Sequence, residues 1–210
     1  MKIGFLGSGH ITSSVIEGIF KSKLKIKKIY ISPRNRLVSK KLSKKFKKVS
    51  ISKNNQQLID MSNWVFLAIT PKVGHRILKD LNFRRNQKII SFISTINLEK
   101  LKKYTKNKNI TIVLPLPFIG IKKGPVIICP KDKKVKKFFD KLGKTIEIKK
   151  EKISKNFWTT SSFMAPFYYM MSVTSNWLIK KGVERKAAED WTREFFLALS
   201  QDSVFKNKLS

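Results

Sequence analysis

The chain has 210 residues, of which 41% are hydrophobic and 11% aromatic, enough for one full domain and a smaller one around a packed core. This composition excludes a disordered chain, and the single cysteine, Cys129, excludes an internal disulfide or a multi-cysteine metal site. Cys129 lies in an apolar run and is expected to be a buried strand residue. No stretch is long and apolar enough to span a membrane, and the chain opens on a core strand instead of a signal segment, so we expect a cytoplasmic protein.

The formal net charge of +33 raises the question of a polyanionic partner. Lysine accounts for 39 of the 46 basic residues, and the lysines are scattered over nearly every segment. Phosphate recognition tends to concentrate arginine, and no base-stacking or zinc-finger signature accompanies the charge. We therefore expect nonspecific binding to polyanions at low salt, but no dedicated nucleic-acid partner.

The first three quarters of the chain alternate between strand and helix patterns. Strands are expected at residues 1–6, 28–32, 49–51, 64–69, 88–93, 110–114, 126–129 and 145–148. Helices are expected from residue 11, and at 36–47, 55–61, 73–81, 98–104 and 135–142. The continuous apolar run at 64–69 is typical of a parallel strand covered on both faces. This order predicts an α/β fold with a Rossmann-like doubly wound sheet.

After residue 150 the strand signals vanish and two long helical patterns follow, one from residue 153 and one at 184–203, with a break at Gly182. We expect a dinucleotide-binding domain at residues 1–150 and a smaller all-helical domain at 151–210. The two helices are more apolar than a surface layer requires, so the helical domain is expected to form a homo-oligomer interface. Packing on the sheet within one chain is the alternative.

A glycine-rich turn follows the first strand. Gly7 allows a tight turn, and Gly9 allows a pyrophosphate to approach the backbone where the next helix begins. The third small position of this fingerprint is held by Thr12, which is bulkier than the usual Gly or Ala. The turn predicts a dinucleotide site.

The second strand ends at Ser32, Pro33, Arg34 and Asn35, where an NAD site would place an acidic residue on the ribose hydroxyls. Hydroxyl, guanidinium and amide groups can all donate to a 2′-phosphate, and the arginine adds a charge. The sequence therefore favours NADP over NAD. The alternative is that Arg34 is one more solvated cation.

Neither histidine has a firm role. His10 lies in the phosphate turn, where it either meets the pyrophosphate or is a partly exposed residue at the helix start. His75 follows Pro71 and is either a proton donor or a solvated helix residue. The sequence has no histidine and carboxylate cluster at ligand spacing, so no metal site is expected, and it identifies no catalytic residue.

Several motifs together resemble pyrroline-5-carboxylate reductase. The resemblance rests on residues 3–11, 32–35, Asn55, 66–71, 89–91 and 113–115, in this order and spacing. It implies an NADPH-dependent oxidoreductase of proline biosynthesis that transfers hydride to the C=N bond of 1-pyrroline-5-carboxylate to give L-proline, working as a dimer. It also implies cofactor contacts at Gly7, Ser8, Gly9, His10, Ile11, Ser32, Arg34, Asn35, Asn55, Ala68, Ile69, Thr70, Pro71, Ser94 and Pro115.

The chain departs from the family pattern on the substrate side. Thr70 stands where the family has lysine, Leu116 replaces an asparagine, and Ser94 with Thr95 replaces an Ala-Gly pair. A glycine-rich motif of the helical domain is changed at 163–168, and the sequence ends at Ser210, before the family's last substrate motif. Two alternatives follow: an NADP-dependent oxidoreductase for another imine or carbonyl compound, or a non-catalytic nucleotide-binding homologue.

Overall fold

The computed structural model describes residues 1–93 and 95–205. The chain divides into two compact units, Met1–Trp158 and Thr159–Ser210. Helix α7 (Glu151–Thr160) runs across this division, and it begins at the residue that follows the predicted domain boundary.

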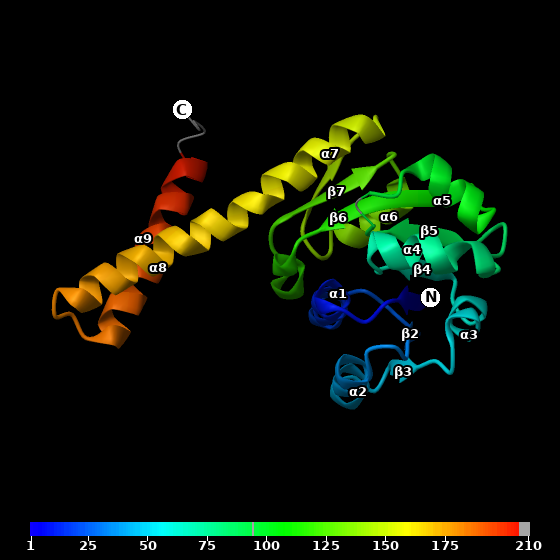
Figure 1. Ribbon diagram of the computed structural model, residues 1–210, viewed down its shortest axis with the longest axis horizontal. Coiled ribbons are helices and arrows are strands. Elements are labelled where there is room, and N and C mark those ends of the chain that lie inside the picture. Colours follow the sequence, from blue (N-terminus) through cyan, green and yellow to red (C-terminus); the bar gives the residue numbers. More distant parts are fainter. Residues whose placement is uncertain (94, 206–210) are drawn as a thin grey trace. The chain divides into compact units, whose positions relative to one another are not determined.

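The first unit is built on one eight-stranded sheet with the order β3-β2-β1-β4-β5-β6-β7-β8 (Figure 1). The strands are β1 (Lys2–Leu6), β2 (Lys28–Ile31), β3 (Val49–Ile51), β4 (Trp64–Leu67), β5 (Lys88–Ser91), β6 (Ile110–Pro115), β7 (Pro125–Cys129) and β8 (Lys144–Glu147). The chain leaves β1 toward β2 on one side and returns to β4 on the other, so the crossover switches direction at β1. In doubly wound sheets, ligands bind outside the carboxyl ends of the strands at this switch point.

Helices cover both faces of the sheet. They are α1 (His10–Lys21), α2 (Arg36–Lys45), α3 (Asn55–Asp60), α4 (Pro71–Ile77), α5 (Leu98–Thr105) and α6 (Lys133–Phe139), with 3-10 turns at Leu78–Asp80 and Pro117–Ile121. Successive strand residues enter opposite core clusters: Phe66 lies in the cluster with α1 and α6, and Leu67 in the cluster with α3 and α5. The predicted Rossmann-like α/β fold is confirmed.

Strand β7 runs antiparallel to β6, whereas every other strand pair is parallel. This reversal was not predicted, although the link at residues 116–124 is too short for a parallel crossover. Because β7 is reversed, Cys129 at its end lies opposite Ile112, near the start of β6. The chain then enters α6 at the amino edge of the sheet. Cys129 is buried, as expected, and burial raises the pKa of its thiol.

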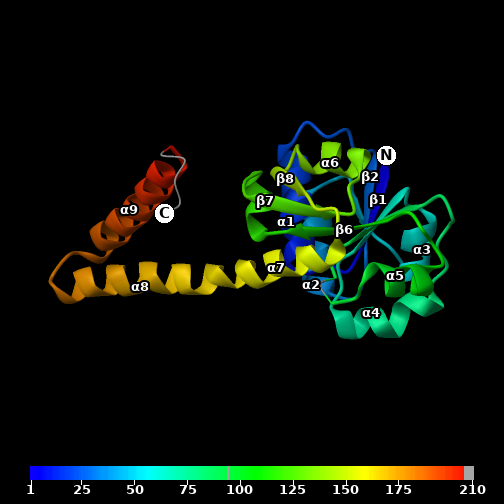
Figure 2. The ribbon, with the colours of Figure 1, turned by 90° about the horizontal axis from the view of Figure 1, so that it is seen from above.

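In the second unit, α8 (Met164–Lys180) and α9 (Arg185–Phe205) form a pair joined by a short turn (Figure 2). The predicted break at Gly182 is confirmed, since its φ of +90° is one that glycine adopts freely. Among residues 159–204, only Ala188 and Thr192 are buried. No helix in the described ranges is both long and apolar enough to cross a membrane.

Candidate functional site

A cavity of about 760 Å³ opens at the carboxyl ends of β1, β2 and β4. Its lining is Leu6, Gly7, Ser8, Gly9, Ser32, Arg34, Asn35, Arg36, Leu37, Asn55, Ala68, Ile69, Thr70, Val73, Arg76 and Ile77. Ten of the fifteen residues expected to contact a cofactor are among them. The cavity lies at the switch point of the sheet, where the topology alone would place a ligand.

The turn between β1 and α1 requires its two glycines for different reasons. Gly7 has a φ of +111°, and a Cβ there would lie 2.2 Å from the carbonyl oxygen of Ala68. Gly9 is the N-cap of α1 and has an ordinary φ, and no atom lies within 4 Å of where its Cβ would be. No side chain caps this helix, so its first N–H groups have no side-chain partner and can bind an anion.

Thr12, in the third position of the glycine fingerprint, is accommodated without exposure to solvent. Its hydroxyl donates a hydrogen bond to the carbonyl of Gly7 at 2.9 Å. The extra bulk at this position therefore ties the first turn of α1 to the glycine turn.

Buried hydroxyl groups join the ends of β1 and β2. The Ser39 hydroxyl donates to the carbonyl of Ser32 at 2.9 Å and lies 3.0 Å from the Ser8 hydroxyl. The Ser32 hydroxyl donates to Oδ1 of Asn55 at 2.9 Å. Ser32 lines the cavity, and without a ligand its hydroxyl proton is donated to Asn55, so its expected contact with a phosphate stays a prediction. This hydrogen bond links the loop after β2 to the start of α3.

Arginines surround the outer part of the cavity. Asn35 caps α2 by accepting from the N–H of Val38 at 3.3 Å, which leaves the NH₂ of its amide for a ligand. Arg34 and Arg36 flank it and are exposed, and Arg76 on α4 also lines the cavity. The described lining contains three arginines and no carboxylate. This balance favours an anionic ligand.

The other predicted contacts lie outside this lining. His10 is exposed and lines a separate groove with residues of α1 and α2, and Ile11 packs against the core. Pro71 is the first residue of α4, and Pro115 is buried at the end of β6, where it pairs with Val126. Ser94 lies outside the described residues.

The cavity also contains side chains that sequence reasoning missed. Val73, Arg76 and Ile77 follow one another at i, i+3 and i+4 on α4, a spacing that puts them on one helix face beside Thr70. This spacing could have identified them. His75 lies outside the lining: its Nδ1 is 2.8 Å from the hydroxyl of Tyr104 on α5.

One family model matches part of the first unit. Residues 2–97 match the family model described as NADP oxidoreductase, coenzyme F420-dependent. No curated protein sequence matches the chain.

Solved structures with a similar fold cover the full chain. Pyrroline-5-carboxylate reductase from Streptococcus pyogenes is 23% identical with a TM-score of 0.83, over 100% of this chain and 81% of that one. Pyrroline carboxylate reductase from Plasmodium falciparum, with NADP bound, is 20% identical with a TM-score of 0.81, over 100% and 80% of the two chains. An imine reductase from Myxococcus stipitatus in complex with NADP⁺ is 10% identical with a TM-score of 0.64, over 98% and 75%. The chain therefore has the fold of NAD(P)-dependent oxidoreductases, and its resemblance to pyrroline-5-carboxylate reductases is confirmed at the level of the fold.

Proposed function

We propose that the protein is an NADP-dependent reductase that transfers hydride to a C=N bond, with 1-pyrroline-5-carboxylate as substrate and L-proline as product. The observation that carries the cofactor choice is the set of three arginines around a cavity whose described lining has no carboxylate. An acidic side chain on the ribose would favour NAD, whereas guanidinium groups favour the 2′-phosphate of NADP.

The residues present fit this cofactor. In the proposal, the N–H groups after Gly9 bind the pyrophosphate, since the open space above Gly9 is the room a Cβ would otherwise occupy. Arg34, Arg36 and the amide of Asn35 bind the 2′-phosphate. NADPH, when bound, supplies the hydride.

The chain's own contribution to the reaction is mainly positioning. Arginines are the only charged side chains in the described lining, so no carboxylate, lysine or histidine is available there as a general acid. Hydride transfer to an imine depends chiefly on holding the two reactants in line and excluding water. Thr70 is the N-cap of α4, lines the cavity and stands where the family resemblance places lysine.

A different imine or carbonyl substrate is the second candidate. The substitutions at Thr70 and Leu116 support it, because a site that loses polar partners binds its original carboxylate substrate poorly. A nucleotide-binding protein without catalysis is the third candidate.

Arg34→Ala tests the cofactor assignment. Loss of a charge-assisted contact should weaken NADPH binding by about 1 to 3 kcal/mol and leave NADH binding nearly unchanged, as measured by calorimetric titration. Arg85→Ala is the matched control, because Arg85 is also exposed but lies outside the cavity lining. Equal weakening of both cofactors in Arg34→Ala would rule out the 2′-phosphate role.

NADPH oxidation over a panel of substrates separates the three candidates. Turnover with 1-pyrroline-5-carboxylate supports the first, and turnover only with other imines or carbonyl compounds supports the second. NADPH binding without turnover of any compound supports the third and refutes the reductase proposal.

The helical unit is proposed to pair with a second copy of the chain, in the cytoplasm. Large aromatic side chains on α8 and α9 support this, since Trp177 is 58% exposed and Trp191 is 63% exposed. A face of this kind is typical of an interface.

A further inference from the structure

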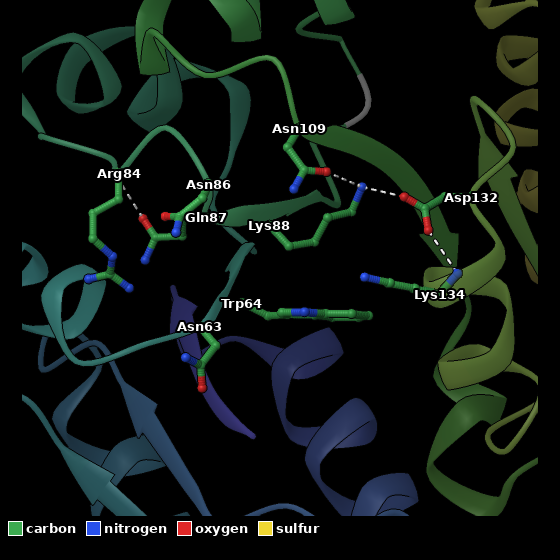
Figure 3. Close-up of a pocket in the computed structure, with 9 residues that line it drawn as sticks. All are labelled: Asn63, Trp64, Arg84, Asn86, Gln87, Lys88, Asn109, Asp132 and Lys134. Atoms are coloured by element: carbon green, nitrogen blue, oxygen red, sulfur yellow. Dashed lines mark hydrogen bonds and ion pairs between the residues drawn. The ribbon is translucent and has the colours of Figure 1, made fainter.

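A second cavity, of about 370 Å³, lies at the opposite, amino edge of the sheet (Figure 3). It is lined by Asn63, Trp64, Arg84, Asn86, Gln87, Lys88, Asn109, Asp132 and Lys134. Trp64 and Lys88 are the first residues of β4 and β5 and pair directly in the sheet. None of these residues lines the proposed cofactor cavity.

Lys88 is the most buried charge of this cavity, with 9% of its side chain exposed. Its ammonium group donates to Oδ1 of Asn109 at 2.9 Å, to the hydroxyl of Thr111 at 2.8 Å and to Oδ2 of Asp132 at 2.5 Å. The other carboxylate oxygen of Asp132 accepts the backbone N–H groups of Lys134 and Val135. Burial alone would raise the pKa of Asp132, but these hydrogen bonds hold it below its ordinary value. The ion pair is therefore complete without a ligand.

Two amide oxygens of the cavity also accept hydrogen bonds from within the chain. Oδ1 of Asn63 accepts the N–H of Lys2 at 2.8 Å, and Oε1 of Gln87 accepts the N–H of Arg84 at 3.3 Å. The Gln87 amide donates to the carbonyls of Ile59 and Ser62.

Among the described residues that line the cavity, the carboxamide of Asn86 has no hydrogen bond and can both donate and accept, and the other capacity left at the rim is donating. The NH₂ groups of Asn63 and Asn109 are unused, and within residues 1–93 and 95–205 the ammonium of Lys134 has neither an ion pair nor a hydrogen bond. Three cationic side chains and one carboxylate line the space, so its formal charge is positive. Such a lining accepts an anion and disfavours a cation.

Trp64 adds a flat surface to these donors. Its ring is half-buried and packs against Phe138, with 5.4 Å between ring centroids. In Figure 3 the ring is seen edge-on, with the side chains of Lys88 and Lys134 on the same side of its plane. An indole face beside unused donors is suited to a ligand that stacks a planar ring and presents an anionic group.

We propose that this cavity binds a small anion that carries a planar ring, with the ring on Trp64 and the anionic group between Lys134 and the amide of Asn109. The cavity volume is within the lower range of small-molecule sites. Phosphate monoesters of nucleosides and aromatic carboxylates share this chemistry. The internally paired Lys88 and Asp132 hold the walls of the site, and the rim residues select the ligand.

The test is a titration of the full chain followed by NMR at 0.15 M salt, which screens nonspecific attraction by the net charge of +33. The signal is the indole N–H of Trp64, assigned by its absence in Trp64→Phe, so the readout is local to this cavity and independent of the proposed cofactor site. The probes are uridine 5′-monophosphate, benzoate and inorganic phosphate. Lys134→Ala is compared with Lys133→Ala, because Lys133 is exposed on the same helix but does not line the cavity.

We expect a saturable shift with at least one ring-bearing probe, weakened about tenfold in Lys134→Ala and unchanged in Lys133→Ala. A shift with uridine 5′-monophosphate alone assigns the site to a phosphate monoester, and a shift with benzoate alone assigns it to a carboxylate. The proposal is overturned if neither ring-bearing probe gives a saturable shift, or if Lys134→Ala and Lys133→Ala weaken probe binding equally. It is also overturned if inorganic phosphate binds as tightly as the ring-bearing probes.

Discussion

Large apolar side chains are buried in the first unit of the chain and exposed in the second. In the first unit, the aromatic side chains around the sheet are buried: Phe5, Phe66 and Phe139 are fully inaccessible to solvent. In the second, aromatic side chains of α8 and α9 such as Trp177 and Tyr169 are more than half exposed. The two units have similarly apolar sequences, but among the described residues the core clusters belong to the first unit. The apolar side chains of the second unit therefore form a surface that another contact could cover.

The largest expected effect comes from emptying the core of the first unit. Phe66 stacks on Phe5 with 4.6 Å between ring centroids and contacts Phe92, Phe138 and Phe139. Phe66→Ala should lower the free energy of unfolding by about 3 to 5 kcal/mol, measured as a shift of the denaturant midpoint. Phe163→Ala makes the same change where the ring is 71% exposed. Its effect should stay within about 0.5 kcal/mol, and similar losses for both variants would contradict the comparison.

Within the first unit, substitutions at the two glycines of the turn should affect different properties: stability at Gly7 and cofactor binding at Gly9. Gly7→Ala should destabilise the fold by about 2 to 4 kcal/mol, because its backbone has a φ of +111° and the new methyl group would meet the Ala68 carbonyl. Gly9→Ala should change stability by less than about 1 kcal/mol, since the methyl group would enter open space at a helix start. It should still weaken NADPH binding. Full NADPH affinity in Gly9→Ala would contradict the pyrophosphate assignment.

The ion pair between Lys88 and Asp132 has a smaller expected effect. Asp132→Asn leaves the nearly buried ammonium without its counter-charge but retains Asn109 and Thr111 as partners. We expect a loss of about 1 to 3 kcal/mol in the free energy of unfolding. Asp140→Asn is the matched control, because Asp140 pairs with Lys136 at the surface. Its loss of unfolding free energy should be about 0.5 kcal/mol.

The stability that Asp132 contributes should depend on pH with a definite sign. The pKa of Asp132 is lowered in the folded chain, so its stabilising contribution is complete above the ordinary carboxyl pKa of about 4. It is lost as the pH falls below that value, through the lowered pKa of the folded state. The difference in unfolding free energy between wild type and Asp132→Asn should therefore shrink below pH 4. A difference that is constant with pH would show that the charge is not its source.

Sequence patterns predicted most of the first unit because its strands are short, continuous apolar runs separated by helical spacing, as at residues 64–69. They also predicted the glycine turn and the Arg34 loop, since local backbone and charge requirements define both. The orientation of β7 and the pairing of Lys88 with Asp132 were not predicted, because both depend on which distant segments meet across the sheet. The hydrogen bond from Ser32 to Asn55 was not predicted either, for the same reason.

The smallest effect on unfolding is expected at the exposed face of the helical unit, where the effect on assembly should be clear. Trp177→Ser removes a side chain that is 58% exposed, so the free energy of unfolding should change by less than about 0.5 kcal/mol at concentrations where the chain is monomeric. If a second copy covers this face, the same substitution should shift the chain toward monomer in light scattering after size exclusion, because large aromatic side chains contribute most of the energy of such interfaces. Lys180→Ser, a neighbouring polar position on the same helix, is the control. A wild-type chain that is monomeric at all concentrations would refute the pairing with a second copy.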